Sequence, residues 1–490
     1  MKLNSLLSVL PFYDTSETIT DIDISHIEAD SREVTAGSLF VCIEGYTVDG
    51  HDYINQAIAN GAVAILAEKD VDTSVPVIRV ANTSRAMAVV AAAFYDHPTK
   101  QFPLIGVTGT NGKTTTTYLL ESILNEFDQK TGLIGTIQMK IGQNTYPVQN
   151  TTPDALFLQR TFQRMHAEHV DAAVMEVSSH ALDLGRVHGC DFDIAVFTNL
   201  SQDHLDYHKD MNDYLHAKSL LFAQLGNTYD ETRKKFAVIN DDDLAAATLK
   251  KSTAQHVITY GCQSSAQVRA TDIHMEVTKT TFTMETPIGS IRINSSLIGK
   301  FNIYNMLAAG AAAICAGVPL SVIQRSLENM KGVSGRFEPV DGSDDFAVVV
   351  DYAHTPDSLE NVLETINGFA ENNVYVVVGC GGDRDKQKRP LMASIAMKYA
   401  DHAIFTSDNP RTEDPNAILD DMTRDLSGTG YDVIESRKEA ISHAVSLAEK
   451  GDIVLIAGKG HETYQEINHT KYDFDDREVA KAAIKSAAGN

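Results

Sequence analysis

A short apolar run that passes directly into a glycine-rich turn decides the fold of this chain. Residues 104–115 read LIGVTGTNGKTT. The pattern predicts a strand over Leu104–Val107, then a loop, then a helix that begins near Lys113. Backbone N–H groups of such a loop and the N-terminus of the helix attract phosphate. In this arrangement Lys113 is the candidate for the β- and γ-phosphates, and the Thr114 hydroxyl is the candidate for a Mg²⁺ contact.

The loop departs from the strict phosphate-binding pattern GxxxxGK[ST], because Val107 occupies the position of the first glycine. A plain turn with a surface lysine is the alternative, but the strand, turn and helix signals follow one another in the required order. Phosphate binding alone leaves a motor, a switch, a kinase and a ligase open. The candidate nucleotide contacts in this loop are Gly109, Thr110, Asn111, Gly112, Lys113, Thr114 and Thr115.

Outward from this loop, short β-branched runs alternate with Ala-rich amphipathic stretches, which is typical of α/β domains with mainly parallel sheets. A polar, proline-flanked segment at 97–103 and a small-residue segment at 331–335 suit domain boundaries. We therefore expect three α/β domains, over residues 1–100, 101–333 and 334–490. The predicted strands are Ser38–Ile43, Ala62–Ala67, Ala172–Glu176, Ile194–Thr198, Ala347–Val350, Val374–Val378, Ala403–Thr406 and Ile453–Ile456.

The composition excludes several classes of protein. With 41 Lys and Arg against 66 Asp and Glu, the 490-residue chain has a formal net charge of −25. Such a charge repels nucleic acid and anionic lipid at long range. The five cysteines show no metal-binding spacing, which fits a reducing compartment. We find no signal peptide and no strongly apolar stretch of about 20 residues, so we expect a cytoplasmic protein without membrane insertion. We also expect a monomer.

The form TGTNGKTT, with further stretches that follow in order over nearly the whole chain, resembles the Mur ligases. These ATP-dependent enzymes form amide bonds in peptidoglycan precursor synthesis, which supports cell-wall biogenesis, cell shape and cell division. The resemblance implies an N-terminal UDP-binding domain, a central P-loop ATPase-like domain and a C-terminal Rossmann-like domain that binds an amino acid. Its closest branch uses ATP and Mg²⁺ to add meso-2,6-diaminopimelate to the D-Glu γ-carboxylate of UDP-N-acetylmuramoyl-L-alanyl-D-glutamate.

Two residues at predicted strand ends are candidate magnesium ligands. Glu176 ends an apolar strand beside the phosphate loop. A carboxylate at such a position more often has a functional role than a carboxylate on an open surface. His204 lies in the stretch TNLSQDHLD after the next strand, and a lone histidine there is more often structural. The resemblance implies that Glu176 and His204 bind two different magnesium ions.

Lys218 interrupts the apolar face of a predicted helix near residues 214–225. One interpretation is a lysine whose stem covers apolar surface while its amine reaches water. A desolvated lysine instead has a lowered pKa and a nucleophilic neutral amine. The resemblance implies that Lys218 reacts with CO₂ to form a carbamate that binds Mg²⁺. The apolar face comprises Tyr214, Leu215, Leu221, Phe222 and Leu225.

Further stretches resemble the segments with which Mur ligases bind the sugar–peptide and the nucleotide, although each alone also fits an ordinary turn. The implied uridine contacts are Ser31, Tyr46 and Thr47; the implied peptide and diphosphate contacts are Asn150, Thr151, Thr152, Ser178 and Arg186. For ATP, the resemblance implies adenine binding by Asn302, a charge contact from Arg336 on domain closure, and a ribose contact from Asp351.

Three predicted loops of the last domain should select the incoming amino acid. They contribute Arg384; Asp408, Asn409, Pro410 and Arg411; and Gly458 and Glu462. Two guanidinium groups suit a substrate with two carboxylates, and Glu462 suits its ammonium group. The segment Asp408–Arg411 also resembles the recognition motif of diaminopimelate-adding ligases, so we expect meso-diaminopimelate. L-Lysine, a surface Asn-Pro turn, a folylpolyglutamate-synthase-like ligase and a P-loop switch or motor are the alternatives.

The implied chemistry has two steps. The γ-carboxylate first becomes an acyl phosphate, which the amine of diaminopimelate then attacks. The expected catalytic residues are Lys113, Glu176, His204 and Lys218, and the expected metal ligands are Thr114, Glu176, His204 and Lys218. The sequence identifies no base for the amine proton.

Overall fold

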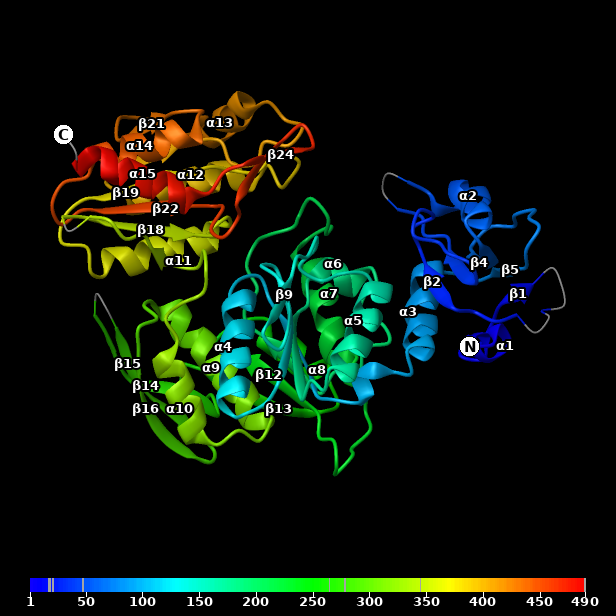
Figure 1. Ribbon diagram of the computed structural model, residues 1–490. Helices are drawn as coiled ribbons and strands as arrows, with labels where there is room; N and C mark the ends of the chain where they lie inside the picture. Colours follow the sequence, from blue (N-terminus) through cyan, green and yellow to red (C-terminus); the bar gives the residue numbers. More distant parts are fainter. Residues whose placement is uncertain are drawn as a thin grey trace.

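The computed structural model describes residues 1–15, 19, 22–45, 48–263, 265–276, 279–343 and 345–488. Three large sheets form three units, which lie in chain order from the N-terminal unit at one end to the C-terminal unit beside the central one (Figure 1). The three-domain α/β fold expected from the sequence is confirmed. The limits 1–100, 101–333 and 334–490 stay a prediction.

The first unit is a five-stranded sheet in the order β1-β5-β4-β3-β2, parallel except for β1. Successive residues of β3 point to opposite faces: Leu39 packs with α1 and α3, and Phe40 packs with α2. The strands are β1 Asp14–Thr15, β2 His26–Glu28, β3 Ser38–Val41, β4 Ala62–Ala67 and β5 Val77–Arg79, and the helices are α1 Leu3–Leu7, α2 Ile54–Ala59 and α3 Thr83–Phe94.

The central unit is an eleven-stranded sheet in the order β16-β15-β14-β13-β12-β11-β6-β10-β7-β8-β9. Its middle is parallel, as expected, but both edges continue as antiparallel hairpins. The strands are β6 Leu104–Thr108, β7 Thr131–Ile134, β8 Met139–Ile141, β9 Asn144–Tyr146, β10 Ala172–Glu176, β11 Ile194–Phe197, β12 Phe236–Asn240, β13 His256–Gly261, β14 Val268–Met275, β15 Thr280–Thr286 and β16 Gly289–Ser295.

Helices cover both faces of this sheet, because its parallel strands are apolar on both sides. One face carries α4 Lys113–Glu126, α9 Lys300–Cys315 and α10 Leu320–Asn329. The opposite face carries α5 Ala155–Ala167, α6 Ser179–Asp183, α7 Met211–Ala223 and α8 Ala246–Lys251.

The third unit is a six-stranded sheet in the order β17-β18-β22-β19-β20-β21, parallel except for β17. Helices α11–α13 cover one face, and α14 and α15 cover the other. The strands are β17 Glu338–Pro339, β18 Ala347–Asp351, β19 Val374–Val378, β20 His402–Phe405, β21 Tyr431–Val433 and β22 Ile453–Ala457, with a separate hairpin of β23 Tyr464–Ile467 and β24 Thr470–Asp473. The helices are α11 Pro356–Asn367, α12 Lys388–Tyr399, α13 Pro415–Thr423, α14 Arg437–Leu447 and α15 Asp476–Ala488.

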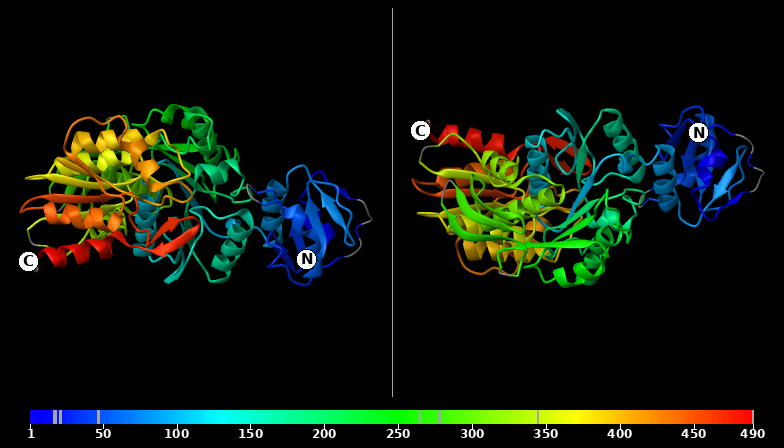
Figure 2. Two further views of the ribbon diagram at one scale, coloured as in Figure 1. Left: turned by 90° about the horizontal axis from the view of Figure 1, so that it is seen from above. Right: turned by 90° about the horizontal axis from the view of Figure 1, so that it is seen from below.

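The views from above and below show the N-terminal unit set apart from the other two units, which overlap in both views (Figure 2). Polar loops follow the carboxyl ends of β6, β10 and β11 in the central sheet and of β18, β19, β20 and β22 in the third. Ligands of open α/β sheets bind at such ends. Over the described ranges, no helix combines the length and apolar character needed to cross a bilayer.

Candidate active site

The phosphate loop joins β6 to α4 as the sequence predicted. Gly109 and Gly112 adopt φ values of +144° and +83°, and a Cβ atom at either position would overlap a neighbouring side chain, Thr198 or Asn305. Glycine is therefore required at both positions. Lys113 Nζ donates to the carbonyl oxygens of Gly109 and Thr110 at 2.9 and 2.7 Å. Burial lowers the pKa of Lys113.

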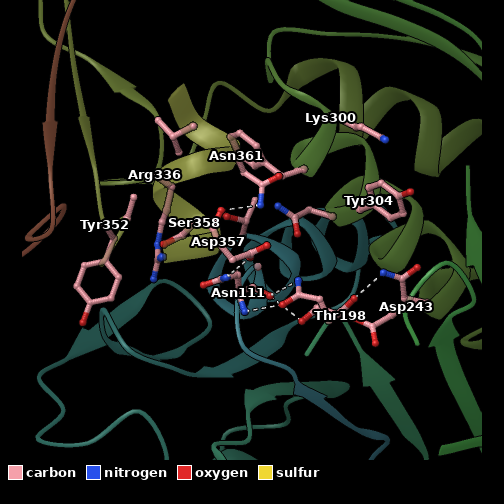
Figure 3. Close-up of a pocket in the computed structure, with 18 of the residues that line it drawn as sticks. Asn111, Thr198, Asp243, Lys300, Tyr304, Arg336, Tyr352, Asp357, Ser358 and Asn361 are labelled. Atoms are coloured by element: carbon pink, nitrogen blue, oxygen red, sulfur yellow. Dashed lines mark hydrogen bonds between the residues drawn. The ribbon is translucent and has the colours of Figure 1, made fainter. Parts of the chain in front are cut away.

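A cavity of about 300 Å³ lies between this loop and the third unit. Figure 3 shows side chains from the loop, from α9 and from the start of α11 around one space. Backbone N–H groups, hydroxyls and an arginine beside a cavity of this kind fit a nucleotide phosphate. The lining residues include Asn111, Gly112, Thr115, Asp242, Lys300, Phe301, Tyr304, Asn305, Arg336, Asp351, Tyr352 and Asp357.

Side chains of the third unit contact the phosphate loop directly. Asn111 Nδ2 donates to Asp357 Oδ2 at 2.8 Å, a contact drawn in Figure 3. Arg336 Nη2 donates to Thr114 Oγ1 at 2.9 Å, and its guanidinium group lies 4.5 Å from the centre of the Tyr352 ring. Arg336 thus lies at the phosphate loop, and its contact with ATP stays a prediction.

Glu176 ends β10 and is fully buried. Its Oε2 accepts hydrogen bonds from the hydroxyls of Thr114 and Thr136 at 3.1 and 2.9 Å, and its Oε1 accepts from the Thr136 N–H at 2.9 Å. A carboxylate in contact with the first hydroxyl of α4 supplies the hard oxygen ligands that Mg²⁺ prefers. The predicted Thr114 and Glu176 pair therefore fits this ion.

His204 contacts a different set of side chains, the rings of His180 and Tyr214. The His204 backbone adopts φ +56°, and the centroids of these two rings lie 4.8 and 6.0 Å from that of the His204 ring. Burial lowers the pKa of His204 to about 3, so the imidazole is neutral and able to bind a metal. Among the described residues, however, no three His, Cys, Asp or Glu side chains form a cluster that could hold a metal ion. Thr114 and Lys218 are not of these residue types, so magnesium binding by the four predicted ligands stays a prediction.

Lys218 is buried in α7, with 1% of its surface exposed. Its Nζ donates to the Gly109 carbonyl at 2.8 Å and lies 4.2 Å from the centre of the Tyr214 ring. Burial, together with the charge of Lys113, lowers the pKa of Lys218 well below its usual value. The amine therefore does not reach water, in contrast to the alternative of a lysine with a solvated head.

The predicted peptide contacts gather around Thr152. The Thr152 hydroxyl donates to the carbonyl of Glu176 at 2.9 Å and accepts the N–H of Ser178 at 3.0 Å. Arg186 Nη1 donates to the Thr152 carbonyl, also at 3.0 Å. Thr151 bonds Thr136, which contacts Glu176 as described, whereas Asn150 is exposed. These residues thus lie beside the candidate magnesium pair.

A second cavity of about 660 Å³ lies between the first unit and the start of α5. Ser31 lines it and donates to Gln56 Oε1 at 3.0 Å. Tyr46 and Thr47, the other predicted uridine contacts, lie outside the described residues. Phe157 and Arg160 of α5 also line this cavity.

Asn302, the predicted adenine contact, does not line the nucleotide cavity. Its Nδ2 donates to the Ile298 carbonyl at 2.8 Å, and its Oδ1 accepts from Asn305 Nδ2 at 3.2 Å. The helix turns Asn305 toward the cavity instead. Asp351 lines the cavity, and burial raises its pKa. Its ribose contact stays a prediction.

The three loops predicted to select the amino acid meet at the carboxyl edge of the third sheet. Asn409 Nδ2 donates to Glu462 Oε2 at 2.9 Å, and the buried Lys459 Nζ donates to both Asn409 Oδ1 and Glu462 Oε2. Arg411 Nη1 donates to the Gly382 carbonyl at 2.7 Å. These bonds bring the loops together, as the sequence predicted.

The remaining predicted residues of this region differ in burial. Asp408 and Pro410 are buried, and a Cβ atom at Gly458 would lie 2.7 Å from Asp408 Oδ2, so glycine allows the two loops to approach. Arg384 is exposed and its Nη1 donates to the Asp383 carbonyl at 3.0 Å. The Arg384 guanidinium is therefore the accessible one of the predicted pair.

This three-unit architecture and its phosphate loop have known counterparts. A UDP-N-acetylmuramoyl-L-alanyl-D-glutamate--2,6-diaminopimelate ligase of Oceanobacillus iheyensis is 61% identical over 489 residues, covering 99% of each chain. The chain belongs to the Mur ligase family. A ligase of the same name from Bacillus cereus is 57% identical to this Mur ligase and covers 100% of both chains.

Three family models match successive parts of this Mur ligase. The models described as Mur ligase family, catalytic domain, as Mur ligase middle domain, and as Mur ligase, glutamate ligase domain match residues 23–95, 107–313 and 335–460. A solved structure of a ligase with the same name as the relatives above is 35% identical, covers 100% of both chains and has a TM-score of 0.70. The MurF ligase of Thermotoga maritima in complex with ADP, at 19% identity, covers 96% of this chain and 98% of its own with a TM-score of 0.65, and shows the fold alone.

Sequence reasoning missed three cavity-lining or loop-joining residues of this Mur ligase. Asn305 follows Asn302 by about one helical turn, and this spacing could have indicated that both asparagines lie on the same side of the helix. Lys459 lies between two glycines directly after an apolar strand, which also marks it as buried near a site. Arg160 offered no such signal, because its cavity forms only when α5 packs against the first unit.

Proposed function

We propose that this Mur ligase adds meso-2,6-diaminopimelate to the D-Glu γ-carboxylate of UDP-N-acetylmuramoyl-L-alanyl-D-glutamate in peptidoglycan precursor synthesis. The observation that carries the proposal is the junction at which a phosphate loop, a buried carboxylate and arginine-bearing loops come together. The full-length relatives named for this reaction support it. We further propose a cytoplasmic enzyme that acts as a monomer and contributes to cell shape and division.

Each substrate has a candidate location. The 660 Å³ cavity with Ser31 suits the uridine end of the sugar–peptide, and the Thr152 cluster suits its peptide end. The cavity bounded by Asn305, Arg336 and Asp351 suits ATP. Tyr352 lines this cavity while its ring lies 5.2 Å from that of His461, the neighbour of Glu462. The amino-acid loops therefore adjoin the nucleotide cavity.

Bound ATP would supply the phosphoryl group that converts the γ-carboxylate to an acyl phosphate, with Mg²⁺ neutralising the phosphate charge. The N–H groups of the loop, Lys113 and Arg336 hold and neutralise the phosphates. Thr114 and Glu176 are the residues that would hold one metal ion, and His204 is the candidate for a second. The amine of diaminopimelate then attacks the activated carbonyl, and phosphate leaves.

Lys218 is the proposed site of carbamate formation. CO₂ adds to a neutral amine, with loss of one proton, and the product is a carboxylate-like group that suits Mg²⁺. Burial supports this role, because a lowered pKa leaves Lys218 neutral at a lower pH than a solvated lysine. We expect intact-mass and peptide analysis to locate a CO₂ adduct at Lys218, and we expect Lys218→Ala to lose turnover. Full activity of Lys218→Ala would contradict this role.

The choice of amino acid depends on Arg384 and Arg411. Meso-diaminopimelate carries a second carboxylate and amine at its far end, whereas L-lysine carries only the amine there. A guanidinium group forms paired, charge-assisted hydrogen bonds with a carboxylate, and L-lysine offers no second carboxylate to the second guanidinium group. The arrangement therefore favours meso-diaminopimelate over L-lysine.

Phosphate release tests the proposal. We expect it to require ATP, UDP-N-acetylmuramoyl-L-alanyl-D-glutamate and an amino acid together, with meso-diaminopimelate preferred over L-lysine. Preference for L-lysine would be consistent with the proposed ligase activity but would contradict the proposed specificity for meso-diaminopimelate. Release with a folate substrate and glutamate would favour a folylpolyglutamate-synthase-like ligase. Equal release with both condensation partners omitted would favour a P-loop switch or motor.

A further inference from the structure

A buried guanidinium group lies beneath the two loops that carry Arg384 and Arg411. Arg389 belongs to α12 and is 1% exposed. Its Nη1 and Nη2 donate to the two carboxylate oxygens of Glu413 at 3.1 and 2.8 Å, and its Nη1 also donates to Asp421 of α13 at 2.8 Å. Hydrogen bonds from Arg389 lower the pKa of Glu413 to about 2, which keeps this group ionised at neutral pH.

Glu413 also ties one loop to the other. Its Oε1 accepts the backbone N–H of Asp383 at 2.6 Å. The Asp383 carboxylate in turn accepts the Thr412 hydroxyl at 2.8 and 2.9 Å and the Thr412 N–H at 3.1 Å. On the same side, Arg411 donates to the Gly382 carbonyl. Every one of these bonds crosses between the segments 382–383 and 411–413.

Both loops adopt a backbone conformation that needs such support. Asp383 and Arg411 have φ values of +52° and +51°, in the left-handed region that non-glycine residues seldom occupy. Left-handed residues persist where surrounding contacts hold them. Asp383 directly precedes Arg384, so its conformation sets the direction in which the Arg384 side chain leaves the loop.

We infer that Glu413 is a positioning residue for amino-acid selection: fixed by Arg389, it sets the spacing and orientation of the Arg384 and Arg411 guanidinium groups. Bidentate pairing with a carboxylate requires a planar alignment, so a small shift of either loop weakens the recognition of a doubly acidic amino acid. Glu413 itself does not touch the substrate. The inference rests on the proposed function and adds a determinant of its specificity.

Glu413→Gln tests the inference, with Asp421→Asn as the matched control. A glutamine amide has only one oxygen that accepts hydrogen bonds, because its other polar atom is an NH₂ group that donates. It therefore cannot replace both carboxylate oxygens that now accept from Arg389 and from the Asp383 N–H. Asp421→Asn removes a carboxylate from the same guanidinium group, but Asp421 contacts neither loop in the bonds above. Steady-state phosphate release gives KM for diaminopimelate, KM for ATP and kcat for each protein.

We expect Glu413→Gln to raise KM for diaminopimelate about tenfold and to reduce the preference over L-lysine, while KM for ATP stays within about twofold. Asp421→Asn should leave KM for diaminopimelate within about twofold. Thr412→Val removes a bond between the same loops without touching Arg389, and should shift KM in the same direction if Glu413→Gln fails to fold.

Three results would overturn the inference. The first is an unchanged KM for diaminopimelate in Glu413→Gln and Thr412→Val. The second is an equal rise in Glu413→Gln and Asp421→Asn, which would indicate a purely structural role for Arg389. The third is an equal rise in KM for ATP. Failure of the unsubstituted enzyme to use diaminopimelate would instead reject the proposed function, so the two failures are distinguishable.

Discussion

The phosphate loop and the amino-acid loops of this Mur ligase are built in opposite ways. The phosphate loop is one continuous stretch, in which a strand, two left-handed glycines and a helix N-terminus present backbone groups. The amino-acid region instead combines Arg384, Arg411 and Glu462 from three separate loops. Side-chain hydrogen bonds from Asn409 to Glu462 and from Arg411 to the Gly382 carbonyl hold these loops together. A phosphate site formed by backbone groups tolerates most side-chain substitutions. In a site formed by side chains, the loss of a single contact changes the substrate specificity.

The largest effect should come from Lys113, the lysine of the phosphate loop. Lys113→Ala removes the partly buried ammonium group that donates to the Gly109 and Thr110 carbonyls, so phosphate release with all substrates should fall about 10³-fold. Lys234→Ala, at an exposed lysine of the same unit, is the control and should retain activity. Similar rates for both variants would show that backbone groups alone are sufficient.

An intermediate effect is expected from the amino-acid loops. Arg411→Ala removes a guanidinium group proposed to bind a carboxylate, so KM for diaminopimelate should rise about 10²-fold, while KM for ATP should stay within about twofold. Steady-state phosphate release with each substrate varied in turn measures both constants. An equal rise in the two constants would show that the two regions do not act separately.

The smallest effect concerns a contact between the phosphate loop and α11 of the third unit. Asp357→Asn keeps an oxygen that can accept from Asn111 Nδ2 but removes a negative charge from the lining of the nucleotide cavity. Less repulsion of the triphosphate should lower KM for ATP about threefold. The effect should shrink at high ionic strength, because salt screens charges. A raised KM would show that the hydrogen bond matters more than the charge.

The sequence predicted the parallel strands best, because continuous apolar runs bounded by turn residues mark strands buried on both faces. Ala62–Ala67, Ala172–Glu176 and Val374–Val378 have the predicted bounds. The antiparallel edges β8–β9 and β15–β16 were not predicted. These strands are short or partly exposed, and their mixed polar sequences resemble loops.

Residues of the candidate site could be predicted where a local sequence pattern indicates them. They could not be predicted where the packing of separate elements determines their position. Lys218 interrupts an apolar helix face, and its burial followed from that periodicity. The sequence could not decide which asparagine of α9 faces the cavity, because the rotation of that helix depends on its neighbours. The Arg389–Glu413 pair was equally hidden, since its two partners belong to different elements and meet only in the folded unit.

Residues 150–160 reach both candidate locations of the sugar–peptide. Thr152, at their start, contacts Glu176 and Ser178, while Phe157 and Arg160 line the 660 Å³ cavity at the first unit. Helix α5 begins between them at Ala155. In the proposed function, this segment would set the distance between the uridine and the reacting carboxylate. A substrate with one more or one fewer peptide residue would then place the wrong atom at the junction.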